Sequence, residues 1–330
     1  MHRSIQFIGT QRSGSNLLRL ILNQHDLISA PHPPHLLKTF VPLLPYYREV
    51  YGNWLRNLIE DMCLWVESNP VPWTNVVLNR EEIANSSASI YDVFEQIYIQ
   101  KAKADKAEIW CCKSTFNVHY VDQLETKIRP FYIHLYRDGR DVAASFKKIL
   151  VGQKHAYHLA KQWHDEQMIS LRFLQGIEEG RKIHISYESL LDRPDEIVST
   201  ICSKLELEYD NNMLRYYTSE ESQHTADSGK MWESVIKPII KNNRGKFFNE
   251  LAEEEIIIFE KVAGSALEKL GYERASPIEK NIILDVDRYD MLNAKMIAER
   301  RKNTTIQELQ NRMKQERLLE EIKKKFEVKK

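Results

Sequence analysis

The 330-residue sequence contains no apolar stretch approaching the ~20 residues that a membrane-spanning helix needs. Its first residues lack a charged segment followed by an apolar one, so we expect no secretory leader. The 47 lysines and arginines are balanced by 47 acidic residues, so no overall field favours nucleic acid or a membrane as a partner. These absences predict a globular protein without a transmembrane segment and without nucleic acid as a partner.

Cysteine is also scarce. The four cysteines are Cys63, Cys111, Cys112 and Cys202, and none has the spacing of a zinc site. Such a set suits buried free thiols in a reducing compartment. We therefore expect a cytoplasmic protein without structural metal or disulfides.

A phosphate-binding loop is indicated near the start of the chain, but part of the usual loop is missing. An apolar run over Ser4–Ile8 leads into a polar loop with Gly9 and Gly14, and a helical pattern follows. Strand, loop and helix in this order are typical of a phosphate site. However, Ser15 stands where a nucleotide P-loop needs lysine, and Asn16 stands where it needs a magnesium-binding hydroxyl. The loop is predicted to hold phosphate without the groups that ATP or GTP chemistry requires.

Further short apolar segments predict a parallel sheet with crossover helices. The expected strands are Glu108–Cys112, Phe131–Tyr136 and Lys182–Ser186, beside Ser4–Ile8. Ligands of such sheets bind beyond the carboxyl ends of the strands. Four polar residues each come shortly after a strand and should share that edge: Arg12, Lys113, Arg137 and Tyr187.

The remaining sequence is predicted to be mainly helical. Residues 36–105 are interpreted as a helical insertion with loops, suited to acceptor recognition, and helices are expected over 140–178, 190–206 and 251–270. We divide the chain into a domain over 1–275 and a charged C-terminal helical extension over 276–330. Residues 288–330 hold 13 lysines and arginines against 7 acids, a net charge of +6. The extension would serve as a solvated helix, a homodimer contact or a contact with an anionic surface.

A second phosphate site is indicated by Tyr136–Ser145. Arg137 ends a strand, and Ser145 lies about two turns along the helix that follows. An arginine and a serine so placed can share one phosphate through charge-assisted hydrogen bonds.

Five segments within residues 4–272 resemble those of sulfotransferases that use 3′-phosphoadenosine 5′-phosphosulfate (PAPS). They follow one another along the chain in the same order as in that family. Residues 9–18 resemble the 5′-phosphosulfate loop of the family, and residues 136–145 resemble its 3′-phosphate motif. The other three are residues 110–116, residues 187–190, and residues 235–238 with 246–247. The last of these is similar to the closing loop of the tyrosylprotein-sulfotransferase branch.

The resemblance implies an α/β fold of P-loop NTPase type, with a central parallel sheet flanked by helices, a helical insertion and a C-terminal helix. It implies transfer of a sulfuryl group from PAPS to a hydroxyl or amine by in-line displacement, leaving 3′,5′-adenosine bisphosphate, with no metal. Two alternatives remain at this point: a non-catalytic protein that binds through the same fold, and a P-loop nucleotide kinase.

Roles of individual residues follow from the same resemblance. The 5′-phosphosulfate would be wrapped by Gln11, Arg12, Ser13, Gly14, Ser15 and Asn16. The 3′-phosphate would be held by Arg137 and Ser145, with Tyr187 near the nucleotide and Lys237 and Lys246 closing over it. Arg12 and Lys113 would stabilise the leaving oxygen.

The general base is open among three histidines. Related branches carry a glutamate where this chain reads Ala30–His35, so His32 is the first candidate and His35 the second. His119 is the third, because cytosolic relatives use a histidine after the family lysine. The acceptor stays open among a hydroxyl-bearing sugar, a lipid, a peptide and a small alcohol.

Overall fold

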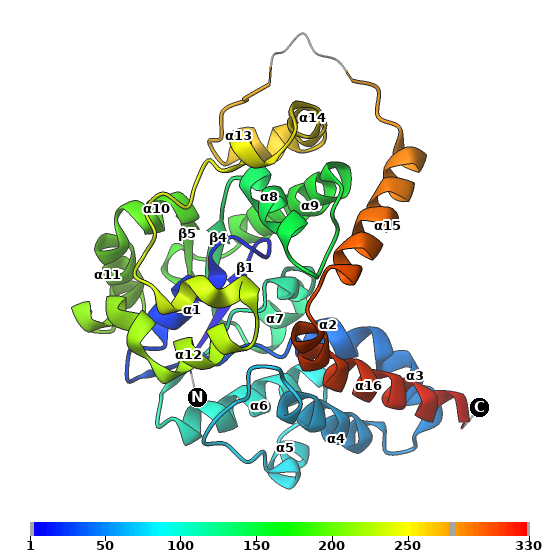
Figure 1. Cartoon of the computed structure of the whole chain (residues 1–330). Coiled ribbons are helices and arrows are strands. Elements are labelled where there is room, and N and C mark those ends of the chain that lie inside the picture. Colours follow the sequence, from blue (N-terminus) through cyan, green and yellow to red (C-terminus); the bar gives the residue numbers. More distant parts are fainter. Residues whose placement is uncertain (1–2, 277–281, 329–330) are drawn as a thin grey trace.

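The computed structural model describes residues 3–276 and 282–328. Its centre is a five-stranded sheet, and every pair of neighbouring strands is parallel (Figure 1). The strand order is β2-β3-β1-β4-β5, with β1 Arg3–Ile8, β2 Ile28–Ser29, β3 Ile109–Cys112, β4 Phe131–Tyr136 and β5 Lys182–Ser186. The predicted parallel sheet is confirmed, and β2 is a short strand that the sequence pattern missed.

Helices cover both faces of the sheet, because alternate side chains of each strand are apolar on opposite sides. On one face, Ile5 and Phe7 of β1 pack with α1 (Ser15–Leu22) and α11 (Pro194–Lys204). On the other face, Ile8 packs with α7 (Val121–Lys127) and α9 (Ala156–Gln175). Burial on both faces fixes the strand register and therefore the edge at which the polar residues meet.

The insertion is helical, as predicted, and it has its own apolar core. This core includes Phe40, Leu58 and Phe94, and it reaches the sheet through Trp110 of β3. The elements of the insertion are α2 Leu36–Phe40, η1 Val41–Leu43, α3 Leu44–Val50, α4 Trp54–Glu67, α5 Arg80–Asn85 and α6 Ile90–Ala104.

Two predicted helices are each interrupted. The helix expected over 140–178 is α8 (Gly139–Lys148) followed by α9, and Gly152 between them has a φ of +77° beside the Phe146 ring. The helix expected over 190–206 is α10 (Tyr187–Asp192) followed by α11, which begins at Pro194. Proline has no N–H to donate into a preceding turn, so the first helix ends there. The helix expected over 251–270 is confirmed as α14 (Glu253–Lys269).

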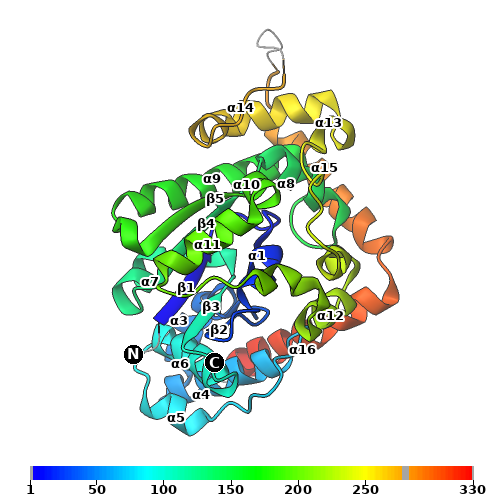
Figure 2. The same ribbon diagram turned by 90° about the vertical axis from the view of Figure 1, so that its left-hand side faces the viewer.

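The C-terminal part forms two helices where one was expected. The α15 helix (Val286–Lys302) packs on α9, with the Tyr289 ring stacked on His155 at 4.5 Å between centroids. The α16 helix (Ile306–Val328) then returns across the molecule to lie on α3 and α4 of the insertion (Figures 1 and 2). The predicted division between 275 and 276 borders residues 277–281, which lie outside the described residues, so it stays a prediction.

Other described elements connect these layers: η2 Thr115–Tyr120, η3 Glu179–Arg181, η4 Asn211–Thr218, α12 Glu220–Asp227, η5 Lys230–Ile236 and α13 Phe247–Glu250. Within residues 3–276 and 282–328, none of the helices combines the length and the apolar character needed to cross a membrane.

Candidate functional site

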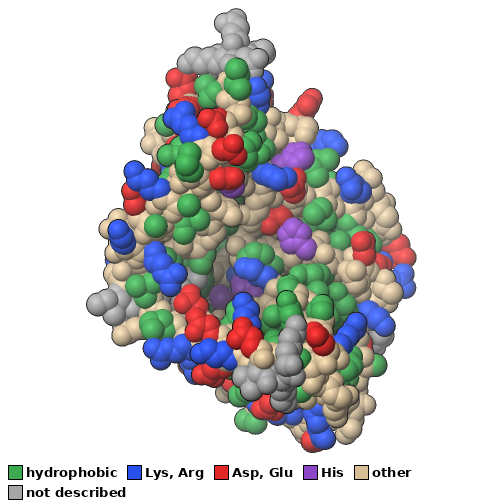
Figure 3. Space-filling view, turned by 90° about the vertical axis from the view of Figure 1, so that its right-hand side faces the viewer, with side chains coloured by type: hydrophobic (Ala, Val, Ile, Leu, Met, Phe, Trp, Pro, Cys, Tyr) green, Lys and Arg blue, Asp and Glu red, His purple; other side chains and the backbone are tan. Residues whose placement is uncertain are grey.

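A cavity of about 750 Å³ opens at the carboxyl edge of the sheet. Basic and histidine side chains lie in its depth, and hydrophobic side chains lie around its mouth (Figure 3). Ten of the predicted site residues line it: Gln11, Arg12, Gly14, Ser15, Asn16, His32, His35, Lys113, Arg137 and Tyr187. The sheet topology therefore brings the predicted residues to one place.

The phosphate loop depends on glycine at one position. Gly14 has a φ of +88°, and a Cβ atom there would lie 2.3 Å from Cδ2 of Tyr187. Only glycine combines this backbone conformation with such close packing. Tyr187 thus closes one side of the loop from α10, while α1 begins directly after Gly14.

Arg12 joins the two predicted phosphate sites. Its Nε donates a hydrogen bond of 3.0 Å to Oγ of Ser145 on α8. Burial, with the nearby charge of Arg137 as the next cause, lowers the pKa of Arg12 to about 10, although the side chain stays cationic at neutral pH. Ser145 is not among the described residues that line the cavity, but it contacts Arg12, which does line it.

Arg137 is held in place by a loop that follows η5. Its guanidinium lies 4.6 Å from the centre of the Tyr187 ring and donates to Asp141 and to the backbone oxygen of Asn243. Asp141 in turn accepts hydrogen bonds from the backbone N–H groups of Gly245 and Phe247.

Sequence reasoning missed the part played by Asn243. Its side-chain amide donates to the hydroxyl of Tyr187 at 2.7 Å. Lys237 and Lys246, which were predicted to close over the nucleotide, are exposed and are not among the described residues lining the cavity. Their contact with a nucleotide stays a prediction. Asn243, which belongs to the same loop, does line the cavity.

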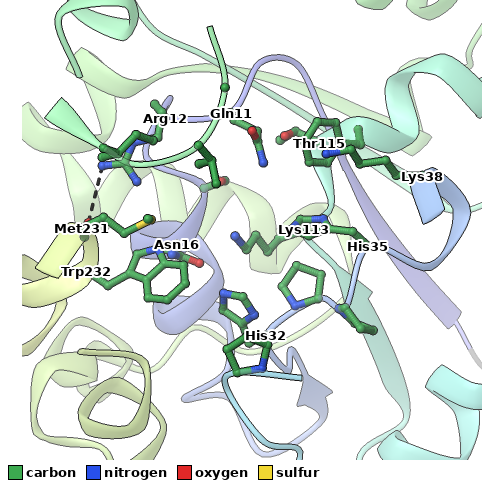
Figure 4. A pocket seen from close by; sticks show the side chains of 18 of the residues that line it. Gln11, Arg12, Asn16, His32, His35, Lys38, Lys113, Thr115, Met231 and Trp232 are labelled. Carbon is green, nitrogen blue, oxygen red and sulfur yellow. Dashed lines mark hydrogen bonds between the residues drawn. The ribbon is translucent and has the colours of Figure 1, made fainter. Parts of the chain in front are cut away.

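Lys113 projects into the centre of the cavity between Asn16 and His32 (Figure 4). It follows β3, and its side chain is buried beside two other cations. Burial, and then the charges of Arg19 and Arg12, lower the pKa of Lys113 to about 7. A buried cation whose charged form is disfavoured in this way would be stabilised by a bound anion.

Further polar atoms in the loop suit a phosphate ligand. Among the described residues, Oγ of Ser13, Oδ1 of Asn16 and Nε of Arg137 are buried with no hydrogen-bond partner. Buried polar groups normally have partners, so the Nε–H group of Arg137, which lines the cavity, is available to a ligand oxygen. Ser13 is not among the described residues that line the cavity.

The histidines fall into two groups. His32 is buried, with its ring 5.1 Å from that of Trp232, and His35 bonds the Ser114 hydroxyl at 2.8 Å. Both line the cavity beside Lys113 (Figure 4). His119 is half-exposed, and its Nε2 lies 3.7 Å from Oε1 of Glu166. It is not among the described residues that line the cavity. The geometry keeps His32 and His35 as candidate bases and gives His119 no place in the cavity.

Comparison with known proteins identifies the family. The model described as "Sulfotransferase family" matches residues 5–211, so this chain belongs to the sulfotransferase family. A protein from Aquifex aeolicus, described as uncharacterized, is 24% identical over 252 residues, which are 73% of this chain. This chain spans only 30% of that relative's length.

Two solved sulfotransferase domains share the fold. The domain from the olefin synthase of Synechococcus PCC 7002 has a TM-score of 0.54 and 21% identity, covering 78% of this chain and 93% of its own. The domain from the curacin biosynthetic pathway has a TM-score of 0.52 and 20% identity, covering 84% and 99% respectively. These likenesses confirm the predicted fold.

Proposed function

We propose that this protein transfers the sulfuryl group of PAPS to a hydroxyl or amine acceptor. The observation that carries the proposal is the Arg12–Ser145 hydrogen bond, which joins the loop of residues 9–16 to the Arg137 site in one cavity. PAPS bears a 5′-phosphosulfate and a 3′-phosphate on one ribose, so it needs two cationic sites that lie close together. The unpartnered Nε–H group of Arg137 and the buried cation of Lys113, whose pKa is lowered, both suit such an anion.

In the proposed reaction PAPS supplies the sulfuryl group, and residues of this chain handle charge and protons. His32 accepts the proton of the acceptor hydroxyl as its oxygen bonds to sulfur. The bond between sulfur and the bridging phosphate oxygen breaks, and that oxygen takes the electron pair. Arg12 and Lys113 then stabilise the negative charge on the leaving oxygen, as preorganised cations in a buried site do.

Binding of the product nucleotide tests the proposal. At a hundredfold excess over Kd, 3′,5′-adenosine bisphosphate should stabilise the folded protein by about 2.7 kcal/mol, seen as a higher Tm. Neither 5′-AMP nor ATP with magnesium should give a comparable shift, and Arg137→Ala should lose it. A shift with ATP and magnesium alone would instead support a kinase. A normal shift without turnover on any acceptor would support a non-catalytic binding protein.

Replacing His32 tests the proposed base. We expect His32→Ala to lower the rate of sulfuryl transfer by ~10²-fold or more, because a positioned base contributes this much to proton removal. The thermal shift with the bisphosphate should persist. His119→Ala, outside the cavity, is the matched control and should keep the wild-type rate. A larger loss in His35→Ala than in His32→Ala would move the base to His35.

A further inference from the structure

The C-terminal helix forms part of the cavity although it lies beyond the matched family region. The match ends at residue 211, yet one face of α16 lines the cavity. The lining residues of α16 are Gln315, Glu316, Leu319 and Lys323. Their spacing of one, three and four residues places them on one side of the helix.

This helix is anchored by buried contacts. Ile322 and Phe326 are 0% and 4% exposed and belong to the apolar core of the insertion. The Phe326 ring lies 4.9 Å from that of Tyr47 and is stacked on Tyr46 at 5.7 Å. The lining face of α16 is therefore held against the insertion.

Polar contacts fix the same arrangement. Lys325 donates a 2.8 Å hydrogen bond to the buried carboxylate of Asp61, which also accepts from the Tyr47 hydroxyl. Gln315 donates to the backbone oxygen of Trp65 on α4. These contacts set the rotation of α16 and thus which of its side chains face the cavity.

Apolar side chains line part of the cavity. Phe116, Trp232 and Leu43 line it from three different elements, and Leu319 adds an apolar side chain from α16. Glu316 is the sole acidic residue among the described lining residues, so this part offers little to a cationic ligand. Its chemistry fits an apolar body several carbon atoms long.

We propose that α16 is the acceptor-selecting wall of the cavity, with Leu319 as a specificity-determining residue, and that the acceptor is an alcohol with an extended apolar body. The inference rests on the proposed function, because it assigns the other half of the cavity to the nucleotide. Sulfuryl transfer then requires the apolar body to lie against α16 while the hydroxyl reaches Lys113 and His32.

Protection of an introduced thiol tests this proposal. The native cysteines are buried, and burial raises the pKa of Cys112 and Cys202 to about 11 and that of Cys63 to about 12, so they react slowly. Leu319→Cys places a thiol on the lining face. Glu320→Cys places one on the next residue, which is exposed and outside the lining, as the matched control.

The measurement is the rate of reaction with a disulfide reagent, with 3′,5′-adenosine bisphosphate present. At 1-octanol concentrations of about ten times its Kd, we expect about tenfold slower labelling of Leu319→Cys and no change in Glu320→Cys. Glucose should protect neither variant. Lys323→Cys, one turn further along the wall, gives a second reporter should Leu319→Cys fail to fold.

Equal rates with and without octanol in both wall variants, or protection by glucose alone, would overturn the proposal. The bisphosphate-induced rise in Tm is measured on the same samples. If it is present without protection, the inference about α16 fails and the proposed function stands. If it is absent from the wild-type protein as well, the proposed function fails.

Discussion

Lys113→Met should lower the rate of sulfuryl transfer by ~10²–10³-fold while making the free protein more stable. The loss is expected because Lys113 would stabilise the leaving oxygen in a buried site, where one such group has this effect. The gain is expected because burial and the charges of Arg19 and Arg12 lower the pKa of Lys113 to about 7, from a usual value near 10.5. A side chain held for catalysis at a cost in stability behaves in this way.

The size of the stability change depends on pH. Between pH 7 and 10.5 the unfolded chain keeps a proton on Lys113 that the folded chain loses, so wild-type stability should rise with pH in that window. Below pH 7 both states are charged and the burial penalty is complete. Lys113→Met should remove this slope and raise the free energy of unfolding at pH 6–7 by about 1 kcal/mol or more. Denaturant unfolding at several pH values measures it, and identical slopes in both proteins would contradict the assignment.

Gly14→Ala should abolish the bisphosphate-induced thermal shift. The added Cβ would lie 2.3 Å from the Tyr187 ring, at a φ of +88° that alanine rarely adopts. Either the loop or Tyr187 must move, and both belong to the cavity. We also expect a loss of about 1–3 kcal/mol in the free energy of unfolding from strain at this position.

Gly264→Ala is the matched control for that substitution. Gly264 lies within α14, and a Cβ there would meet no atom within 4 Å. Alanine in a helix interior should stabilise the protein by about 0.5–1 kcal/mol, and nucleotide binding should be unchanged. If Gly14→Ala kept the thermal shift, or if both variants lost it equally, the proposed role of the loop of residues 9–16 in binding the nucleotide would be contradicted.

The sequence predicted the sheet, and it predicted many of the residues that the structure brings together in one cavity, because both depend on local patterns. Apolar runs such as Phe131–Tyr136 mark buried strands, and a polar residue directly after each strand must lie at the ligand edge. The two-residue strand Ile28–Ser29 has no such pattern. The break around Gly152 was missed because the apolar spacing continues on both sides of it.

The part of the cavity that we assign to the acceptor was less predictable, because contacts between residues far apart in the sequence form it. The contact between Phe326 and Tyr46 joins residues 280 positions apart, and nothing in the local spacing of α16 indicates it. Asn243 likewise reaches Tyr187 from a loop without regular structure. The basic charge of the extension suggested an outside partner, whereas its apolar residues pack on the insertion of the same chain. The predicted homodimer or anionic-surface contact stays a prediction.

The most direct test of the account is a turnover measurement with PAPS, 1-octanol and a chelator of divalent metals. We predict that 3′,5′-adenosine bisphosphate and octyl sulfate form in equal amounts, and that Lys113→Met forms both at least ~10²-fold more slowly. The account would be contradicted if the wild-type protein released the bisphosphate no faster than Lys113→Met does. That result would have to hold with octanol and equally with phenol, sugar and amine acceptors.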